Sequence, residues 1–517
     1  MPEFPLIPVV TAAQAALWDE RARADAGIPG RVLMEAAGRA AAQVIGREFR
    51  EALGRGVLLV AGAGNNGGDG WVVARALRAV GVRVIATEVP KPRSPDCEAN
   101  RALALADGVT LLEPEAPWPA VGLLVDGLLG TGAGDAPRGA VAELARRAAD
   151  HGPPIAAIDG PTGLDLSTGQ AHGPIRAGLT VTFGGLRRGH LLAREWVGRL
   201  VVVDMGFPAP DPDWPVFVTD AWAARTLPPL VPAMHKGDRG RVLVIGGDVG
   251  MAGAAMHAAR AAFACGAGLV KLALTEPSIR AAQANLPDAL TVTTALGPRL
   301  EPELVEAIAW ADAVVLGPGL GRGEARAALV QAVLERATAP VVIDADALHV
   351  PGARAAGHAP RVLTPHPGEF AAQFPEIAEL ARSDRFEAPG AALELTAQPL
   401  NRSTAILLKG VPTVIAGPEG TRVVGAGNPA LATGGTGDLL AGTIAAWLAR
   451  GLTPLDAAAL GAQVMGRAAD LAAAERGPRV TRPEDVAAQY VHLWRRWAEP
   501  EPPEPPVLLR LDPPAVG

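Results

Sequence analysis

The sequence predicts an α/β protein built from two consecutive domains. Short apolar strands alternate with helical segments along the chain, and most of these strands end in a glycine or an aspartate. Strands that are apolar throughout are typical of parallel sheets covered by helices on both faces. Aromatic residues form only 4% of the chain and small aliphatic residues dominate, which favours closely packed layers of helix on sheet.

The composition excludes several classes of function. The 517 residues suffice for about two to four domains, and the formal net charge of -7 offers no basic surface to a nucleic acid. The distant cysteines Cys97 and Cys265 exclude a disulfide framework and fit a reducing compartment. We find no signal-peptide pattern at the start and no apolar run of the ~18 residues that span a membrane. We therefore expect a cytoplasmic protein without a membrane partner.

The first half shows the pattern of a doubly wound sheet. Residues 11–50 have helical spacing, with Thr11 placed to cap the first helix. Two strands, Val57–Ala61 and Val82–Thr87, flank a glycine loop and a helix, as in a parallel βαβ unit. Four more short strands follow in the text GLLVDGLLGTG, PIAAIDGPTGLD, LTVTFGG and RLVVVDMG.

Proline density marks the boundaries between the predicted domains. The segment from Phe207 to Pro232 reads as a linker with one short helical patch near Ala221, and a second α/β series follows it. After Ala498 the chain is so rich in proline that we expect a poorly ordered tail. The predicted divisions are residues 1–215, 225–498 and 499–517.

The loop GAGNNGGDG carries the first candidate site. Its glycines allow the backbone to approach a phosphate, and the side-chain oxygens of Asn65, Asn66 and Asp69 suit a ligand or a hard cation. Its spacing is neither the dinucleotide fingerprint nor the Walker A motif. Asp126 and Asp159 end neighbouring strands, so they either line the same crevice or merely cap the turns that follow.

Residues 8 to about 210 resemble the NAD(P)H-hydrate epimerase domain of the YjeF N-terminal type. The matching text is LMEAAG, GAGNNGGDG, VDGLLGTG and IDGPTGLD. The resemblance implies a Rossmann-like fold that interconverts the R and S epimers of hydrated NADH and NADPH, called NADHX and NADPHX. The implied substrate contacts are Asn65, Asn66, Gly67, Gly68, Asp69, Gly130, Thr131, Gly132, Ala133, Gly134, Asp135, Ala136 and Asp159.

The same resemblance implies a potassium site in this domain. Its ligands would be Asn66, Asp126 and Thr162. We select Asp126 as the catalytic acid and base, because epimerisation needs proton movement at the hydrated carbon. Related sequences have an apolar residue, proline and serine after the second aspartate, whereas this chain has Gly160, Pro161 and Thr162. Threonine keeps the hydroxyl group, and the effect of Gly160 is not predicted.

The second half carries a larger set of loop motifs. They are GGDVGMAGAA, GPGLG at 317–321, DADAL at 344–348, TPHPGEF at 364–370, KGVPT at 409–413 and GGTGD at 434–438. Each has a simpler reading: a turn, a helix start, a structural histidine at His366 or a solvated lysine at Lys409. Taken together they provide donors for phosphates, acids for a metal ion, and a base in Asp438 beside glycine amides at a helix N-terminus.

Residues 225 to 498 resemble the ADP- or ATP-dependent NAD(P)H-hydrate dehydratases, which have a ribokinase-like fold. The resemblance implies that Ala254, Gly319, His366 and Asp438 contact the hydrated dinucleotide. The implied nucleotide-phosphate contacts are Lys409, Gly410, Val411, Pro412, Thr413 and Gly437. Asp438 would be the catalytic base, Mg²⁺ would accompany ADP or ATP, and Glu369 is a candidate for placing that ion.

Both resemblances predict a bifunctional repair enzyme that is an isomerase in its first half and a lyase in its second. Its partners would be the small molecules NADHX, NADPHX, ADP and ATP, and we expect a homo-oligomer. The alternative is a small-molecule kinase of the ribokinase superfamily with a non-catalytic, nucleotide-sensing first domain. His366 within TPHPGE and the asparagines of the first loop argue against it. Loop spacing does not distinguish ADP from ATP, since both present a terminal phosphate.

Overall fold

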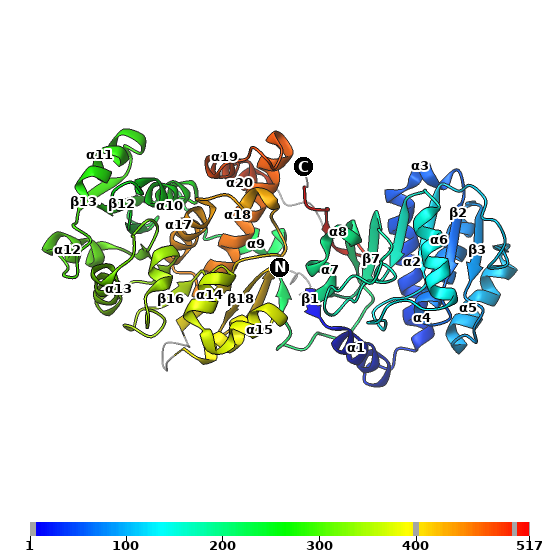
Figure 1. Cartoon of the computed structure of the whole chain (residues 1–517). Coiled ribbons are helices and arrows are strands. Elements are labelled where there is room, and N and C mark those ends of the chain that lie inside the picture. The colour runs from blue at the N-terminus through cyan, green and yellow to red at the C-terminus, as the bar shows by residue number, and fades with distance from the viewer. Residues whose placement is uncertain (1–6, 397–402, 499–503, 516–517) are drawn as a thin grey trace. The chain divides into compact units, whose positions relative to one another are not determined.

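The chain forms two compact α/β units. A computed structural model describes residues 7–396, 403–498 and 504–515 (Figure 1). The first unit comprises Met1–Trp214 and Glu501–Pro514, and the second comprises Pro215–Pro500 and Ala515–Gly517. Both are built on largely parallel sheets, which confirms the predicted fold class. Among the described residues, no helix has the length and apolar character needed to cross a membrane.

The first unit is a doubly wound sheet with the strand order β4-β3-β2-β5-β6-β7-β9-β20. Its strands are β2 (Val57–Ala61), β3 (Val84–Glu88), β4 (Thr110–Leu111), β5 (Leu123–Gly127), β6 (Ile155–Ile158), β7 (Leu179–Phe183), β9 (Arg199–Val203) and β20 (Val507–Leu511), with a separate parallel pair β1 (Ile7–Val10) and β8 (Leu186–Arg187). Its helices are α1 (Ala12–Ala24), α2 (Gly30–Glu48), α3 (Arg50–Leu53), α4 (Asn65–Ala79), α5 (Pro95–Ala106), α6 (Ala140–Asp150), α7 (Arg188–Leu192) and α8 (Arg194–Val197).

The order of the strands places a topological switch point between β2 and β5. From β2 the chain winds outward through β3 and β4, and it then returns to pair β5 with the other side of β2. Apolar residues of α2, α4 and α5 cover one face of the sheet, and those of α6 cover the other. The carboxyl ends of β2 and β5 therefore lie at the place where such sheets bind ligands.

Helix α4 begins earlier than the sequence predicts. The text NNGGDG was interpreted as a loop, but Asn65 is already the first helical residue. A Cβ atom on Gly67 would overlap with the carbonyl oxygen of Gly62, and one on Gly68 would lie 2.5 Å from the sulfur of Met34. The glycines are therefore required by close packing around the start of the helix, in addition to any contact with a ligand.

The proline-rich tail contains a strand, which corrects the expectation of a poorly ordered segment. Strand β20 pairs antiparallel with β9, with Arg510 opposite Val201 and Leu511 opposite Leu200. Leu509 and Leu511 are buried, so alternate residues of the strand pack into the first unit. The apolar run VLLRL overrides the surrounding prolines. Residues 499–503, 516 and 517 lie outside the described part of the chain.

The segment predicted as a linker is also largely structured. Trp214 is buried against Trp18, with ring centroids 5.7 Å apart. The next residues form β10 (Val216–Phe217) and helix α9 (Asp220–Thr226), which confirms the helical patch expected near Ala221. The packing of Trp214 on Trp18 thus holds the start of this proline-rich segment in place. Sequence periodicity does not reveal such a contact in so short a segment.

The second unit has the strand order β13-β12-β11-β14-β15-β16-β17-β18-β19-β10. Its further strands are β11 (Arg241–Ile245), β12 (Leu269–Leu274), β13 (Leu290–Thr293), β14 (Ala313–Leu316), β15 (Val341–Ile343), β16 (Arg361–Leu363), β17 (Thr404–Leu408), β18 (Thr413–Gly417) and β19 (Gly420–Val424). Its further helices are α10 (Ala252–Ala264), α11 (Glu276–Asn285), α12 (Pro302–Trp310), α13 (Glu324–Arg336), α14 (Pro367–Gln373), α15 (Ala378–Ser383), α16 (Ala388–Glu394), α17 (Thr436–Leu448), α18 (Pro454–Arg476), α19 (Pro483–Ala488) and α20 (Tyr490–Ala498).

This sheet has its switch point between β11 and β14. It is parallel from β13 to β17, and β18 and β19 continue it as an antiparallel pair. Apolar residues of α10, α17 and α18 cover one face, and those of α12, α13, α14 and α16 cover the other. The loops after β11, β14, β15, β16 and β17 lie at the carboxyl ends of adjacent strands, and all the motifs singled out before β18 begin in these loops.

A glycine brings the helix that carries Asp438 against its neighbour. A Cβ atom on Gly442 of α17 would overlap with the carbonyl oxygen of Ala258 in α10. The two backbones therefore pack in direct contact. Helix α17 starts within the GGTGD motif, and α10 follows the loop after β11. The contact between the two helices therefore fixes the position of Asp438 relative to that loop.

Candidate active sites

Asp126 is the centre of the cluster in the first unit. It lies in β5 and is fully buried. Its Oδ1 accepts hydrogen bonds from the Thr162 hydroxyl at 2.8 Å and from the Leu128 amide at 3.1 Å, and its Oδ2 accepts one from the Thr162 amide at 2.8 Å. Burial raises the pKa of Asp126 to about 6 although these hydrogen bonds oppose the shift. This carboxylate can therefore change its protonation state near neutral pH.

Asp159 is a second carboxylate with the opposite electrostatic character. It follows β6 with a φ of 63°, a left-handed conformation that is strained for a residue other than glycine. Its Oδ2 accepts a hydrogen bond from the Thr131 amide at 2.7 Å and another from the Thr131 hydroxyl. Burial alone would raise its pKa, but the Arg187 guanidinium and the Thr131 hydrogen bonds outweigh burial and lower the pKa. Asp159 therefore stays ionised.

The residues that hold Asp159 were not predicted from the sequence. Arg187 places its Nη2 3.4 Å from Asp159 Oδ1 and donates from Nε to the Thr131 hydroxyl at 3.0 Å. His190 is fully buried, and its Nδ1 accepts from the Arg187 amide, so its Nε2 donates to the Asp159 carbonyl at 2.8 Å. Burial lowers the pKa of His190 to about 4, which keeps the ring neutral. The sequence analysis did not single out the run RRGH, because nothing in its local pattern indicates that its side chains are buried.

Asn66 and Gly130 complete this cluster. A Cβ atom on Gly130 would lie 2.9 Å from Asn66 Oδ1 and 3.0 Å from Asp159 Oδ2, so the glycine leaves room where these two oxygens meet. The Nδ2 atom of Asn66 is buried without a hydrogen-bond partner among the described residues. Such an orphaned donor, next to the two carboxylates of this cluster, fits a polar ligand.

The remaining predicted residues of the first unit lie at different depths. Asn65 is exposed at the start of α4, and Asp69 is half-buried, with a pKa raised well above its ordinary value by burial and by Asp159. Gly67 and Gly68 are buried in the first turns of α4. The end of the predicted loop does not join the cluster, since Gly132, Gly134, Asp135 and Ala136 are exposed, and Ala133 is half-buried in a turn closed on Gly130.

Potassium fits the chemistry of these donors. Asn66, Asp126 and Thr162 supply an amide, a carboxylate and a hydroxyl oxygen, the hard donors that alkali and alkaline-earth ions prefer. Thr162 and Asp126 are in direct contact, and Asn66 lies at the adjacent Gly130. Within the described residues, no group of three or more His, Cys, Asp or Glu side chains is arranged to hold a metal ion.

In the second unit a lysine connects the loops after β15, β16 and β17. The Nζ atom of Lys409 lies 3.0 Å from Asp344 Oδ1 and 3.7 Å from Glu369 Oε2. Asp344 is buried and also accepts a hydrogen bond from the Thr364 hydroxyl at 2.7 Å. Burial would lower the pKa of Lys409, but Asp344 and Glu369 outweigh it and raise the pKa. Asp344 was predicted only as part of the DADAL motif, without a role of its own.

Asp438 faces the same cluster from the first turn of α17. Burial and the neighbouring Asp344 raise its pKa to about 7, although Lys409 opposes the shift. Gly435 precedes the helix with a φ of 98°, and a Cβ atom on Gly437 would lie 3.5 Å from Lys409 Nζ. The predicted base, the predicted phosphate contact and the amides of a helix N-terminus thus lie together. This arrangement suits stabilisation of negative charge that develops beside a base.

His366 and Glu369 form a reciprocal cap on α14. His366 Nδ1 accepts from the amides of Gly368 and Glu369 at 3.0 and 3.3 Å, and Glu369 Oε2 accepts from the His366 amide at 2.8 Å. The tautomer that accepts at Nδ1 carries its proton on Nε2. Because the His366 side chain is 55% exposed, the ring keeps a free surface for a ligand beyond its structural role.

Ala254 and Gly319 lie next to each other after β11 and β14, the two strands that border the switch point. A Cβ atom on Gly319 would be 3.1 Å from the Ala254 Cβ and 2.7 Å from the Met251 carbonyl. Arg326 supports this wall, with its Nη2 2.5 Å from Asp248 Oδ2. In the 409–413 loop, the Thr413 hydroxyl donates a hydrogen bond to the Gly410 carbonyl at 3.1 Å. Val411 of the same loop is exposed. Pro412 follows a cis peptide bond.

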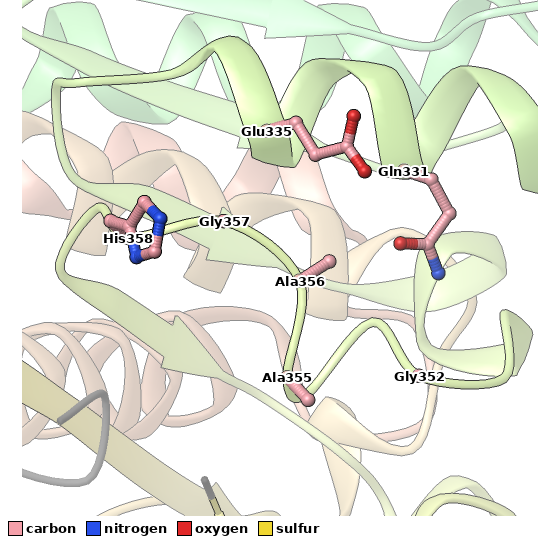
Figure 2. Close-up of a pocket in the computed structure, with 7 residues that line it drawn as sticks. All are labelled: Gln331, Glu335, Gly352, Ala355, Ala356, Gly357 and His358. Carbon is pink, nitrogen blue, oxygen red and sulfur yellow. The ribbon is translucent and has the colours of Figure 1, made fainter. Parts of the chain in front are cut away.

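A pocket of about 500 Å³ lies elsewhere in the second unit. Its walls come from helix α13 and from the loop between β15 and β16, and Figure 2 shows Gln331 and Glu335 projecting from the helix and His358 from the loop. The lining residues are Gln331, Glu335, Gly352, Ala355, Ala356, Gly357 and His358. None of them belongs to the predicted sites. The loop leads into the amino end of β16, whereas the predicted sites use carboxyl ends.

Comparison with known proteins relates the whole chain to one family. A family model described as YjeF-related protein N-terminus matches residues 30–189, and one described as NAD(P)H-hydrate dehydratase matches residues 242–491. The bifunctional NAD(P)H-hydrate repair enzyme Nnr of Escherichia coli (strain K12) is 37% identical over 82% of this chain and 82% of its own length. The chain belongs to the bifunctional NAD(P)H-hydrate repair enzymes.

Further members of the repair-enzyme family cover even more of the chain. The Nnr protein of Moorella thermoacetica is 36% identical over 95% of this chain and 97% of its own length. Among solved structures, the ADP/ATP-dependent NAD(P)H-hydrate dehydratase of Bacillus subtilis, co-crystallised with ATP and Mg²⁺, is 31% identical, with a TM-score of 0.48 over 54% of this chain and 98% of that chain. The family predicted from the motifs is thereby confirmed by the sequence relatives.

Proposed function

We propose that this repair-family chain restores hydrated nicotinamide dinucleotides at two separate sites. The first unit epimerises the R and S forms of NADHX and NADPHX, and the second unit dehydrates the S form with ADP or ATP. One observation carries the proposal. Each unit places a carboxylate of raised pKa beside polar side chains that follow the carboxyl ends of its strands: Asp126 beside Thr162 in the first unit, and Asp438 near Asp344 and Lys409 in the second.

In the dehydratase site Asp438 acts as the general base. It takes the proton of the C6 hydroxyl while that oxygen bonds to the terminal phosphorus of the nucleotide, and the bond from this phosphorus to the bridging oxygen breaks. The C6–O bond then breaks with its electron pair on the departing phosphate. Loss of the C5 proton forms the ring double bond and regenerates the dihydronicotinamide. Phosphate leaves far more readily than hydroxide, which explains why a nucleotide is consumed.

The neighbours of Asp438 bind and neutralise the transferred phosphoryl group. The Gly435–Gly437 amides at the start of α17 point their dipole at the phosphoryl oxygens, and Lys409 adds positive charge from the next strand end. Glu369 and Asp344 are the carboxylates that would hold Mg²⁺, and the ion, when bound, shields the phosphate charge. His366, Ala254 and Gly319 would contact the hydrated dinucleotide.

In the epimerase site the hydrated carbon bears both a hydroxyl group and the ring nitrogen. Inversion requires one of those bonds to break and to form again on the other face, with a proton leaving and returning. Asp126, with a pKa of about 6, is suited to carry that proton. Asp159 is less suited because Arg187 holds it ionised, and it serves instead to orient the substrate beside Thr131. Potassium, held by Asn66, Asp126 and Thr162, would fix the substrate oxygens.

Two variants distinguish these roles. With purified R and S hydrates, recovery of the dihydronicotinamide absorbance is followed in the presence of ADP or ATP with Mg²⁺. Asp438→Asn should abolish recovery from both epimers, and Asp126→Asn should slow recovery from R alone to its spontaneous rate. Failure of the wild-type protein to restore S hydrate with either nucleotide would overturn the proposal. If Asp126→Asn has no effect on R while Asp159→Asn does, the acid and base is Asp159.

We further propose that the enzyme works as a homo-oligomer in the cytoplasm, where its substrates and nucleotides occur. Both cysteines, Cys97 and Cys265, are unpaired and buried, which suits a reducing compartment. Light scattering of the purified protein measures the oligomeric state, and a mass equal to one chain would contradict this part of the proposal.

A further inference from the structure

A guanidinium group lies directly against the 409–413 loop of the second unit. Arg385 belongs to the segment between α15 and α16. Its Nη2 donates to the Lys409 carbonyl at 3.1 Å and its Nη1 donates to the Val411 carbonyl at 3.4 Å. Because these carbonyls flank Gly410, the guanidinium holds the backbone of the loop on both sides of the glycine.

Gly410 is the residue that permits this approach. Its φ is 150°, and a Cβ atom at this position would overlap with Arg385 Nη2 and lie 2.8 Å from both Cζ and Nη1. Any side chain would displace the guanidinium from the loop. The glycine after Lys409 is therefore explained by a specific neighbour, in addition to the flexibility that a phosphate loop requires.

The charges of the site call for another cation. Lys409 is already matched by Asp344 and Glu369, and Asp438 brings a further carboxylate into the same cluster. A nucleotide entering with two or three phosphates would meet net negative charge from these four side chains. The proposed Mg²⁺ would offset part of this negative charge, and a positive side chain at the loop other than Lys409 would strengthen the binding of the phosphates further.

Arg385 is such a group. Within the described part of the chain, no carboxylate lies at ion-pair distance from its guanidinium, and burial alone lowers its pKa. Arginine stays charged even after a shift of that kind. Of its five N–H donors two serve the loop carbonyls, and Nε is buried without a partner among the described residues. The remaining Nη donors and the uncompensated charge lie at the loop.

We propose that Arg385 is a nucleotide-positioning residue, which holds the Lys409–Thr413 loop in its phosphate-binding form and supplies the positive charge that the paired Lys409 does not. This inference rests on the proposed function, in which the loop binds ADP or ATP. It assigns the recognition of the nucleotide's phosphates to a residue from a different part of the chain than any of the loop motifs.

The test compares nucleotide binding by Arg385→Gln, Arg385→Lys and a matched control, Arg382→Gln, in the full-length protein. Arg382 is an exposed arginine of α15 paired with Glu379, three residues before Arg385 in the chain. Calorimetric titrations use Mg²⁺ with ADP, Mg²⁺ with ATP, and adenosine alone. We expect Arg385→Gln to weaken ADP and ATP binding by at least about tenfold, the usual worth of a charged hydrogen bond. Adenosine binding should not change.

Further readouts separate charge from mere support of the fold. The ADP affinity of the wild type should fall with added salt more steeply than that of Arg385→Gln, because screening removes only the charge that is present. Arg385→Lys should keep the salt dependence and recover part of the affinity, and Arg382→Gln should behave as the wild type. Equal losses of affinity for adenosine and ADP in Arg385→Gln, or an unchanged ADP affinity in that variant, would overturn the inference about Arg385 but leave the proposed function standing. A wild type that binds neither nucleotide would overturn the proposed function with it.

Discussion

The Nζ atom of Lys409 lies 3.0 Å from Oδ1 of Asp344, a residue 65 positions earlier in the chain. The two residues follow β17 and β15, so the ion pair reaches across the end of β16. The aspartate is buried and the lysine is 22% exposed. This pair orders the lysine at the start of the 409–413 loop, and it makes the stability of the second unit depend on a residue of the candidate site.

Removing the lysine alone should therefore destabilise the second unit. Lys409→Met leaves the Asp344 carboxylate buried without its cation, which costs about 3 kcal/mol of unfolding free energy. The double variant Lys409→Met with Asp344→Asn should regain most of the lost unfolding free energy, as measured by urea unfolding. Dehydration of the S hydrate should be lost in both the single and the double variant. The exposed Lys236→Met is the control and should unfold like the wild type. A Lys409→Met protein of unchanged stability would show that Asp344 is compensated by other groups.

The pH dependence of dehydration should report Asp438. A base must be ionised to accept a proton, and burial raises the pKa of Asp438 to about 7. Activity should thus be full above this pKa and should fall about tenfold per pH unit below it. The measurement is kcat/KM for the S hydrate at saturating nucleotide from about pH 5.5 to about 9, corrected for spontaneous loss of hydrate. A flat profile through neutrality would exclude Asp438 as the titrating base.

The close contact between α10 and α17 gives a prediction that involves no charge. Gly442→Ala places a methyl group on the carbonyl oxygen of Ala258, and neither backbone can move without disturbing the core. We expect a loss of more than about 2 kcal/mol in unfolding free energy. Gly253→Ala in α10 is the matched control, since a Cβ atom there meets nothing within 4 Å. It should be neutral or slightly stabilising. Equal stability of the two variants would contradict the direct contact.

The C-terminal strand should support the first unit only. Truncation after residue 503 removes β20 and exposes the edge of β9, together with the apolar surface covered by Leu509 and Leu511. Thermal unfolding of the first unit should shift to lower temperature and epimerase activity should decline on warming, whereas dehydration of the S hydrate should persist. Leu511→Asp should reproduce the effect without a truncation. Arg510→Gln, at an exposed ion pair with Glu504, should have little effect.

The fold was predictable because its signals are local. Apolar strands followed by glycine or aspartate specified two parallel sheets, and strand β2 was predicted with its observed bounds, Val57–Ala61. The predictions failed where tertiary contacts override local preference. The start of α4 was interpreted as a loop because glycine lowers helix propensity, whereas packing against Met34 and Gly62 selects glycine at those positions. The prolines around β20 led to the prediction of a poorly ordered tail, whereas pairing with β9 stabilises a strand there.

The structure brings several of the predicted site residues together, but the sequence does not predict the side chains that support them. The strand-end rule brings Asp126, Asp159 and the asparagine loop to one edge of the first sheet, and it places Lys409 and Asp344 at one edge of the second. Asp438 joins that second cluster from the first turn of α17. The supporting groups could not be predicted, because Arg187 and Arg385 are distant in sequence from the residues they hold. The local sequence also does not distinguish a buried arginine from an exposed one. Which carboxylate has a raised pKa also depends on burial, and that follows from the whole fold.

The pairing of β20 with β9 has a consequence for how the chain is made. Synthesis proceeds from the amino terminus, so residues 199–203 leave the ribosome some 300 positions before their partner strand at 507–511. Throughout that interval the growing chain carries a first unit whose sheet has an open edge at β9, and β20 closes this edge only after residues 215–498 have been translated. The unit whose synthesis begins first is thus the one whose sheet is completed later.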